Sequence, residues 1–408
     1  MRKNFKRFAT ALGFTLSLTA LAGCNGALQL GNSNSDKQNA QNAAESQAPR
    51  SQVRIYFRDV SQLEAASRAG VDLFENVDRT AGTVDALATA KGEDALKRLG
   101  IRYEVLEAPR TTRGAGLPSG YQTVEAVMAD VKQVAANYPS IVRLETIGKS
   151  LQDRPLTAVH VTSKPQGIQP AVLITSGQHA RELPPVELNM RLLKLLTEQY
   201  GKDPAITKLV DTRDIWLVPV LNPDGRTMVE GGSAMWRKNA RNNGDGTRGV
   251  DTNRNADDHF EQGNPSTHAD DYRGSAPFSE PESQAIRDLC AREKFTVSLD
   301  IHCYGGMFLW PPGNTSTPTK DEATFRKIGD HIAKPLGYRY GTINRTIYPT
   351  YADMATWQYN AHGILAFAAE LQDPRFNPPF SQVDTDWKQW KDNLLYLIDV
   401  ADSPRTRS

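Results

Sequence analysis

The sequence has almost no net charge and few cysteines. Its 48 Lys and Arg residues balance 47 Asp and Glu residues, which leaves a formal charge of +1 over 408 residues. This balance gives no electrostatic reason to expect a nucleic acid or an acidic partner. The apolar run at residues 8–22 is too short to span a membrane as a helix of the mature protein. The default interpretation is a soluble, enzyme-like body longer than one average domain.

The first 24 residues have the pattern of a secretory leader. Four basic residues precede the apolar run, which ends in Leu21-Ala-Gly-Cys24. This ending resembles the bacterial lipobox, in which the cysteine is acylated and becomes the new N-terminus. The alternative is an ordinary signal peptide with an incidental Cys24. Residues 25–50, rich in Asn, Gln, Ser and Ala, predict a flexible tether. We therefore expect a lipid-anchored protein of the bacterial cell envelope, on either membrane, facing the periplasm or the exterior.

Residues 51–107 predict a small α+β module. Strands and helices are expected in the order strand, helix, strand, strand, helix, strand, at 53–57, 62–69, 71–77, 82–88, 93–99 and 101–106. This is the ferredoxin-like βαββαβ arrangement, with Gly70 and Gly100 placed to end the two helices. Residues 108–120 contain glycines, prolines and arginines and predict a loop-like linker.

The main catalytic signal is a histidine and a glutamate three residues apart, His179 and Glu182, followed over a hundred residues later by His302. Both places follow strand-like runs, so the side chains would emerge at strand ends, where α/β sheets place their sites. Two imidazoles and one carboxylate are the protein ligands of a catalytic zinc that keeps a position open for water. A His-x-x-Glu pair also occurs by chance on loops, so the rest of the chain decides.

Further polar residues supply the other groups that a zinc peptidase needs. Arg237 is suited to polarising a carbonyl, and Asn253 beside Arg254 forms a fork suited to a carboxylate. Glu370 ends an apolar run, where an unused carboxylate is costly to bury. Together with Asn222-Pro-Asp-Gly, Tyr272-Arg-Gly and Phe278-Ser-Glu-Pro-Glu, these segments resemble the zinc metallocarboxypeptidases of the pancreatic A and B type, over about residues 112–402.

The resemblance implies a peptide hydrolase with one zinc per chain, which acts on the C-termini of peptides or proteins as a monomer. It places zinc on His179, Glu182 and His302, the catalytic base at Glu370 and the transition-state arginine at Arg237. It assigns substrate contacts to Asn253, Arg254, Tyr348 and Arg181, with Ala355 at the floor of the specificity pocket. Asp251 matches a carboxylate that orients a zinc-bound imidazole, here expected to be His179.

Residues 121–402 alternate apolar strands with amphipathic helices, as expected for an α/β catalytic domain. Strands are predicted at 141–145, 156–161, 171–175, 215–220 and 363–369, and helices at 124–136, from Pro184 onward and at 387–400. The resemblance implies a mixed, twisted sheet of about eight strands between helices, preceded by the ferredoxin-like module. Relatives are often zymogens, so the module is either a pro-domain over the cleft or a permanent spacer. In the first case the linker arginines are the natural cleavage targets.

Substrate preference and the two remaining cysteines are less constrained by the sequence. The two positions that the family uses for basic specificity hold Ala355 and Gly313, so apolar or aromatic C-terminal residues are favoured, while Asp353 leaves Lys or Arg open. Cys290 and Cys303 are expected to be buried free thiols. The alternatives are a peptidase that trims peptidoglycan stem peptides, an inactive binding module and a structural lipoprotein. An inactive module or a structural lipoprotein would not need all three zinc ligands or the carboxylate-binding residues Asn253 and Arg254, and all of these are present.

Overall fold

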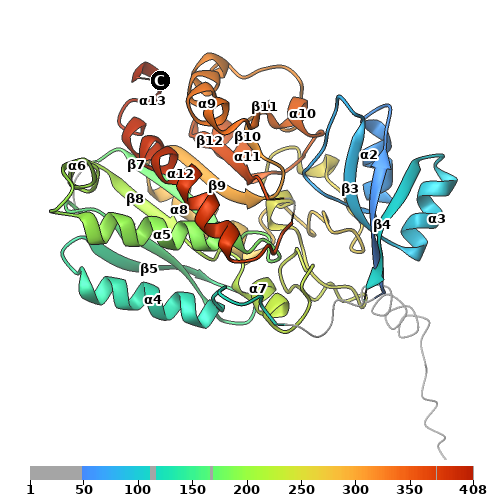
Figure 1. Ribbon diagram of the computed structural model, residues 1–408, viewed down its shortest axis with the longest axis horizontal. Helices are drawn as coiled ribbons and strands as arrows, with labels where there is room; N and C mark the ends of the chain where they lie inside the picture. The colour runs from blue at the N-terminus through green and yellow to red at the C-terminus, as the bar shows by residue number, and fades with distance from the viewer. Residues whose placement is uncertain (1–47, 111–115, 166–168, 374, 408) are drawn as a thin grey trace, which may run out of the picture.

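The computed structural model describes residues 48–110, 116–165, 169–373 and 375–407, which form two sheets, one in each domain (Figure 1). Cys24 and most of the expected tether lie outside the described residues. Within the described ranges, no helix combines the length and the apolar character needed to cross a bilayer.

The N-terminal module is a four-stranded antiparallel sheet in the order β2-β3-β1-β4, with two helices (Figure 1). Its elements are β1 (Arg50–Tyr56), α2 (Ser61–Arg68), β2 (Asp72–Leu73), β3 (Thr83–Thr89), α3 (Ala90–Arg98) and β4 (Arg102–Arg110). The order of strands and helices along the chain is the one that the sequence predicts. However, β2 has two residues where a strand over 71–77 was expected. The chain leaves the sheet there because Phe74 packs edge-on against Tyr304 and Phe376 of the catalytic domain.

The catalytic domain is built on an eight-stranded mixed sheet, in the order β11-β10-β12-β9-β7-β8-β6-β5. Its strands are β5 (Val142–Lys149), β6 (Pro155–Val161), β7 (Ala171–Ser176), β8 (Asp214–Val218), β9 (Phe295–Cys303), β10 (Met307–Trp310), β11 (Arg339–Thr342) and β12 (Leu365–Leu371). The central strands β12, β9, β7 and β8 run parallel, whereas β6 and β10 pair antiparallel with β8 and β12. Every residue of β7 and β8 is buried, which explains their continuous apolar sequences. The expected mixed sheet of about eight strands is confirmed.

Helices cover both faces of this sheet (Figure 1). They are α4 (Val124–Asn137), α5 (Pro184–Gln199), α6 (Pro204–Thr212), α7 (Pro223–Glu230), α8 (Pro281–Arg292), α9 (Glu322–Leu336), α10 (Ile343–Thr346), α11 (Met354–His362), α12 (Ser381–Val400) and α13 (Pro404–Arg407), with 3-10 turns η1 (Thr252–Arg254) and η2 (Phe260–Gln262). Helices α4, α5, α9 and α12 pack into one apolar core, and α8 and α11 into another. Cys303 belongs to the first core and Cys290 to the second, and both are buried free thiols, as expected.

One apolar core joins the two domains. Side chains of the module such as Val53 and Leu63 pack in the same cluster as Leu309 and Ile347 of the catalytic domain. Arg79 of the module also donates hydrogen bonds to the backbone carbonyls of Asn344 and Ile347, each at 2.8 Å. The module therefore docks through a packed surface beside β10 and α10 (Figure 1).

Candidate active site and metal centre

Three buried side chains meet at the carboxyl ends of β7 and β9. One ligand atom from each of His179, Glu182 and His302 lies within 4.8 Å of the others. The Nδ1 atom of His179 lies 2.7 Å from Oε1 of Glu182, and the Nδ1 atom of His302 lies 2.9 Å from Oε2. Two imidazole nitrogens and a carboxylate that converge at a buried position match the donor chemistry and number of a zinc site with an open position. The residues therefore fit the metal that the sequence predicts.

The strand register explains this convergence. β7 and β9 are parallel neighbours, so the residues that follow them reach the same edge of the sheet. Directly after β7, Gly177 has φ of +64°, a left-handed conformation that glycine adopts without strain and that turns the chain toward His179. β12 runs parallel to β9 with Glu370 directly opposite His302. The catalytic glutamate expected from the sequence thus lies next to the predicted ligands.

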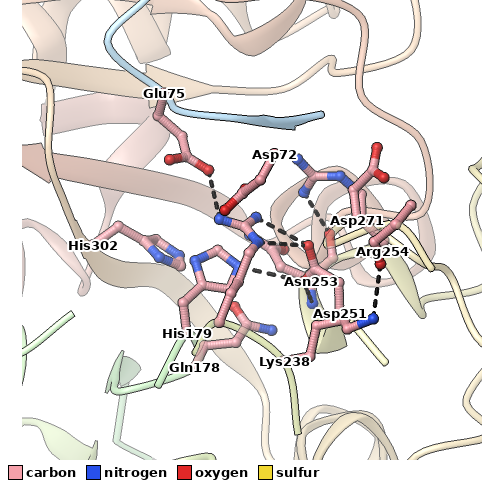
Figure 2. A network of polar contacts seen from close by, with 12 residues as sticks. Asp72, Glu75, Gln178, His179, Lys238, Asp251, Asn253, Arg254, Asp271 and His302 are labelled. Atoms are coloured by element: carbon pink, nitrogen blue, oxygen red, sulfur yellow. Dashed lines mark hydrogen bonds and ion pairs between the residues drawn. The ribbon is translucent and has the colours of Figure 1, made fainter. Parts of the chain in front are cut away.

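Each histidine of the triad has a carboxylate at its other ring nitrogen. The Nε2 atom of His179 lies 3.3 Å from Oδ1 of Asp251 (Figure 2), and Nε2 of His302 lies 3.0 Å from Oδ2 of Asp300. Both contacts are within ion-pair range, although they are not aligned as hydrogen bonds. Such carboxylates fix the orientation of metal-binding imidazoles. Burial alone would raise the pKa of Asp251, but Arg237 and His179 lower it well below its ordinary value.

Glu370 and Arg237 line one cavity of about 470 Å³ together with His179 and His302. Burial raises the pKa of Glu370 well above its ordinary value, nearby Glu75 raises it further, and His302 opposes the rise. A divalent cation at the triad would act in the same direction as His302. The Oε2 atom of Glu370 has no hydrogen-bond partner among the described residues. It is therefore available to a molecule in the cavity.

Arg237 is held from two sides. Its Nε donates to Oδ2 of Asp251 at 3.0 Å, and its Nη1 donates to Oε1 of Glu75 at 2.7 Å. The backbone carbonyl of Arg237 also accepts a hydrogen bond from the amide of Ala180 at 2.9 Å, which ties its loop to the segment between His179 and Glu182. This network fixes the guanidinium beside the predicted metal ligands.

The residues expected to bind a terminal carboxylate also gather here. Asn253 and Arg254 lie in η1 and line the cavity of about 470 Å³ together with Ala355. Nη1 of Arg254 donates to the carbonyl oxygen of Asn253 at 2.8 Å, and Oδ1 of Asn253 accepts the amide of Met354 at 2.9 Å. Tyr348 lines, with Arg254 and Arg237, a second cavity of about 680 Å³ at the boundary with the module.

Two carboxylates of the module enter the same site, which the sequence analysis does not predict. Figure 2 shows Asp72 and Glu75 pointing into the polar cluster around His179. Glu75 pairs with Arg237, and Asp72 accepts hydrogen bonds from both terminal nitrogens of Arg181. Burial would raise the pKa of Glu75, but Arg237 and His179 lower it below its ordinary value. The module thus supplies an anionic group at the position of the predicted transition-state arginine.

Arg181 differs from the other predicted substrate contacts. Its side chain is fully buried, pairs with Asp72 and lies 4.1 Å from the centre of the Phe376 ring. It lines neither of the two cavities. With the module docked, the guanidinium of Arg181 is therefore paired with Asp72 instead of facing either cavity. The other predicted residues of the site line the cavities or lie next to the residues that do.

Comparisons with known proteins agree with this geometry. The family model described as zinc carboxypeptidase matches residues 127–393. Carboxypeptidase A2 of Rattus norvegicus is 31% identical over 288 residues, which cover 67% of this chain and 68% of that protein. Mast cell carboxypeptidase A of Homo sapiens is 32% identical over 265 residues, which cover 62% and 63% of the two chains.

Two solved structures share the fold, module included. Carboxypeptidase A from Helicoverpa armigera superposes with a TM-score of 0.78 at 20% identity and covers 89% of this chain and 99% of its own. Thrombin activatable fibrinolysis inhibitor gives a TM-score of 0.71 at 22% identity, with 86% and 99% covered. The family match, the relatives and the buried His-Glu-His cluster lead to one conclusion: the chain belongs to the zinc carboxypeptidase family and is a metallocarboxypeptidase.

Proposed function

We propose that the protein removes the C-terminal residue from peptides with a free terminal carboxylate. The observation that supports this is the shared cavity of Glu370, Arg254 and the two histidines of the ligand triad. A fork that binds a terminal carboxylate lies there beside a base and a metal-binding set, which is the arrangement an exopeptidase needs.

Each residue of the cavity then has a defined task. His179, Glu182 and His302 would hold the zinc, which would lower the pKa of a bound water and polarise the scissile carbonyl. Glu370, through its free oxygen, accepts a proton from the attacking water and returns it to the leaving amine. Arg237, fixed by Asp251, donates to the oxyanion that forms on the carbonyl oxygen.

The residues that would bind a terminal carboxylate, the clamp of Asn253, Arg254 and Tyr348, decide between an exopeptidase and an endopeptidase. Arg254 offers a planar pair of donors to a carboxylate, Asn253 lies beside it, and Tyr348 lines the neighbouring cavity together with Arg254. An internal peptide segment brings no carboxylate to this fork, so a buried guanidinium would stay without its partner. Free C-termini are therefore the substrates that the geometry favours.

The preference for apolar or aromatic terminal residues rests on the walls of the same cavity. Ala355 contributes to them together with Leu309, Ile343, Ile347 and Ala368. These side chains leave apolar surface for a side chain of the substrate to cover.

A chelator experiment on matched peptides tests the exopeptidase. Peptides with free and with amidated C-termini are incubated with the zinc-loaded protein, before and after cleavage of the linker, and the products are read by mass spectrometry. We expect loss of single C-terminal residues from the free peptides only, abolished by the chelator. Equal cleavage of the amidated peptides would contradict the proposal. Peptidoglycan stem peptides in the same assay test that alternative substrate.

The module is proposed to act as an inhibitory pro-domain. Glu75 lines the catalytic cavity and neutralises Arg237, and Asp72 holds Arg181. A docked module would therefore compete with the anionic groups of a substrate for both arginines. Limited proteolysis within residues 108–120, followed by N-terminal sequencing and assay, tests this. Activity that does not change after the linker is cut would contradict the pro-domain.

Lipid attachment at Cys24 is the proposal for localisation, and it rests on the Leu-Ala-Gly-Cys sequence alone. We expect the wild-type protein to incorporate labelled fatty acid and to sediment with membranes, whereas Cys24→Ser does neither. Membrane retention of the serine variant, with no acyl group on wild-type Cys24, would contradict the lipid anchor.

A further inference from the structure

The cavity of about 680 Å³ at the boundary with the module, here called the interdomain cavity, adjoins the catalytic cavity of about 470 Å³. Arg237, Arg254 and Thr350 line both of them. In the proposed exopeptidase, Arg254 binds the terminal carboxylate and Arg237 the oxygen of the scissile carbonyl. The terminal residue then lies in the catalytic cavity, and the peptide before the scissile bond leaves past Arg237 into the interdomain cavity.

A carboxylate without a cationic partner lies in the wall of the interdomain cavity. Asp271 lines this cavity with Arg254, and Figure 2 shows both side chains in the same polar cluster. Oδ2 of Asp271 accepts the hydroxyl of Ser67 at 2.6 Å, and Oδ1 accepts the side-chain amide of Asn264 at 2.8 Å. Both donors are neutral. Among the residues that the structure describes, no Lys, Arg or His forms an ion pair with Asp271.

The adjacent acid, Asp270, is compensated in a different way. Its Oδ2 pairs with Nη1 of Arg50 of the module at 2.6 Å. Burial would raise its pKa, but Arg50, Lys238 and Arg181 lower it below its ordinary value. Lys238 and Arg181 belong to the catalytic domain, so Asp270 keeps cationic neighbours when the module leaves. Asp271 loses the hydroxyl group of the module at the same moment and keeps only its neutral amide donor.

The positive charges around the interdomain cavity are already engaged during catalysis. The terminal carboxylate of the substrate occupies Arg254, and Asp251 holds Nη2 of Arg237 at 2.9 Å. Arg68 also lines the cavity, but it belongs to the module and leaves with it. The charge that remains without a partner in the wall is the carboxylate of Asp271, which favours a cation from the substrate.

We propose that Asp271 recognises a Lys or Arg at the penultimate position of the substrate, directly before the bond that is cleaved. This rests on the proposed exopeptidase and adds to it a preference at a second position of the peptide. Long basic side chains can reach such a carboxylate through their flexible alkyl stems. In the docked form, Ser67 of the module occupies the carboxylate oxygen that the cation of the substrate contacts after the linker is cut.

The test uses peptides that all end in Leu and differ only in the residue before it, which is Arg, citrulline, Lys or norleucine. Citrulline has nearly the shape of arginine without its charge. For the zinc-loaded protein after cleavage of the linker, we expect kcat/KM for Arg to exceed that for citrulline by about three- to tenfold. The effect is modest because Asp271 is only half-buried, and ion pairs near solvent are weak. The Lys-to-norleucine ratio should behave in the same way.

Three variants separate the charge of Asp271 from its structural role. Asp271→Asn keeps the shape, and its ratios should fall to about one, whereas Asp271→Glu keeps the charge and should retain a preference. The exposed Asp257→Asn removes one charge of the same domain outside both cavities and should keep the wild-type ratios. Added salt should lower the Arg-to-citrulline ratio of the wild type but not that of Asp271→Asn. Asp271→Ser is the substitute if the asparagine variant does not fold.

Equal cleavage of the Arg and citrulline peptides by the wild type would overturn the role of Asp271 while leaving the exopeptidase intact. So would a wild-type ratio in Asp271→Asn, or an equal loss of the ratio in Asp257→Asn, which would reveal a general effect of charge. If the zinc-loaded, cut protein cleaves none of the peptides, the proposed function is wrong and this inference with it.

Discussion

The two domains both bury acidic side chains, but they neutralise them in different ways. In the catalytic domain, Asp251 and Asp300 lie against histidines of the same domain. In the module, Asp72 and Glu75 find their cations across the domain boundary, on Arg181 and Arg237. The acids beside the catalytic histidines are thus compensated within one domain, whereas Asp72 and Glu75 have their shortest ion pairs across the boundary, although Arg50 of the module also lies 3.9 Å from Asp72.

Because of this difference, docking of the module places its acidic side chains in the active site. A buried carboxylate without a partner is costly, so the pairs of Asp72 with Arg181 and of Glu75 with Arg237 stabilise the docked module. The same pairing places an anion on the arginine expected to stabilise the transition state. Stability of the docked form and inhibition would then arise from the same contacts.

We expect the largest effect from a substitution of Glu370, which tests whether the catalytic base lies in the catalytic domain. Glu370→Gln should lower kcat by about 10²- to 10⁴-fold, because the amide has nearly the same shape but cannot accept a proton. Zinc content and melting temperature should stay close to wild type, which separates a chemical defect from a folding defect. A loss of less than about tenfold would show that Glu370 is not the base.

Arg254→Ala should have the next largest effect. Loss of a charge-assisted pair with the terminal carboxylate, typically about 1.5 to 3 kcal/mol, predicts a fall in kcat/KM of about ten- to a few hundred-fold for peptides with free C-termini. The exposed Arg248→Ala is the matched control. If the two variants lost activity equally, or if amidated peptides were affected as much as free ones, the clamp would be assigned wrongly.

Neutralising Asp72 and Glu75 tests whether the acids of the module inhibit the catalytic domain. The double variant Asp72→Asn and Glu75→Gln keeps the shapes but removes both charges, so the uncut chain should gain about tenfold or more in activity. The exposed Glu104→Gln in the same module is the control and should change nothing. After the linker is cut, wild type and variant should be equally active. Unchanged activity of the uncut double variant would show that the two acids do not inhibit the enzyme, even if they help to hold the module in place.

Much of the catalytic domain could be predicted from the sequence because its signals are local. Apolar runs predicted the strands that lead to His179 and His302, and the matching motifs placed Arg237 and Glu370. The lateral order of the strands has no such local signal, since it depends on pairings such as Glu370 opposite His302 that are far apart in the chain. β10 and β11 have only four residues each, too few for a periodic pattern to stand out.

The contacts of Asp72 and Glu75 with the active site could not be predicted for a similar reason. Residues 71–77 look like an ordinary strand, but only Asp72 and Leu73 pair as one. Phe74 and Glu75 instead contact the catalytic domain, and the energy that holds them there comes from Phe376 and Arg237, about 300 and 160 residues later. Tertiary contacts override the local preference at this point. Two acids on either side of an aromatic residue were the available signal, but acids are common on exposed strands.

The smallest expected effect on activity concerns an acid that neither domain neutralises. Glu282 is buried at the start of α8, its Oε2 accepts one hydrogen bond from Asn239 at 3.1 Å, and burial raises its pKa to about 7. A carboxyl group whose pKa is raised on folding contributes stability that is fully present below its unfolded value near 4.5 and is lost as the pH rises through about 7. Glu282→Gln removes this titration. Its melting temperature should therefore exceed that of the wild type by a few degrees at pH 8 and by less at pH 5, with little change in kcat. A difference in melting temperature that does not grow with pH would show that Glu282 is already ionised in the folded protein, so that its burial is compensated.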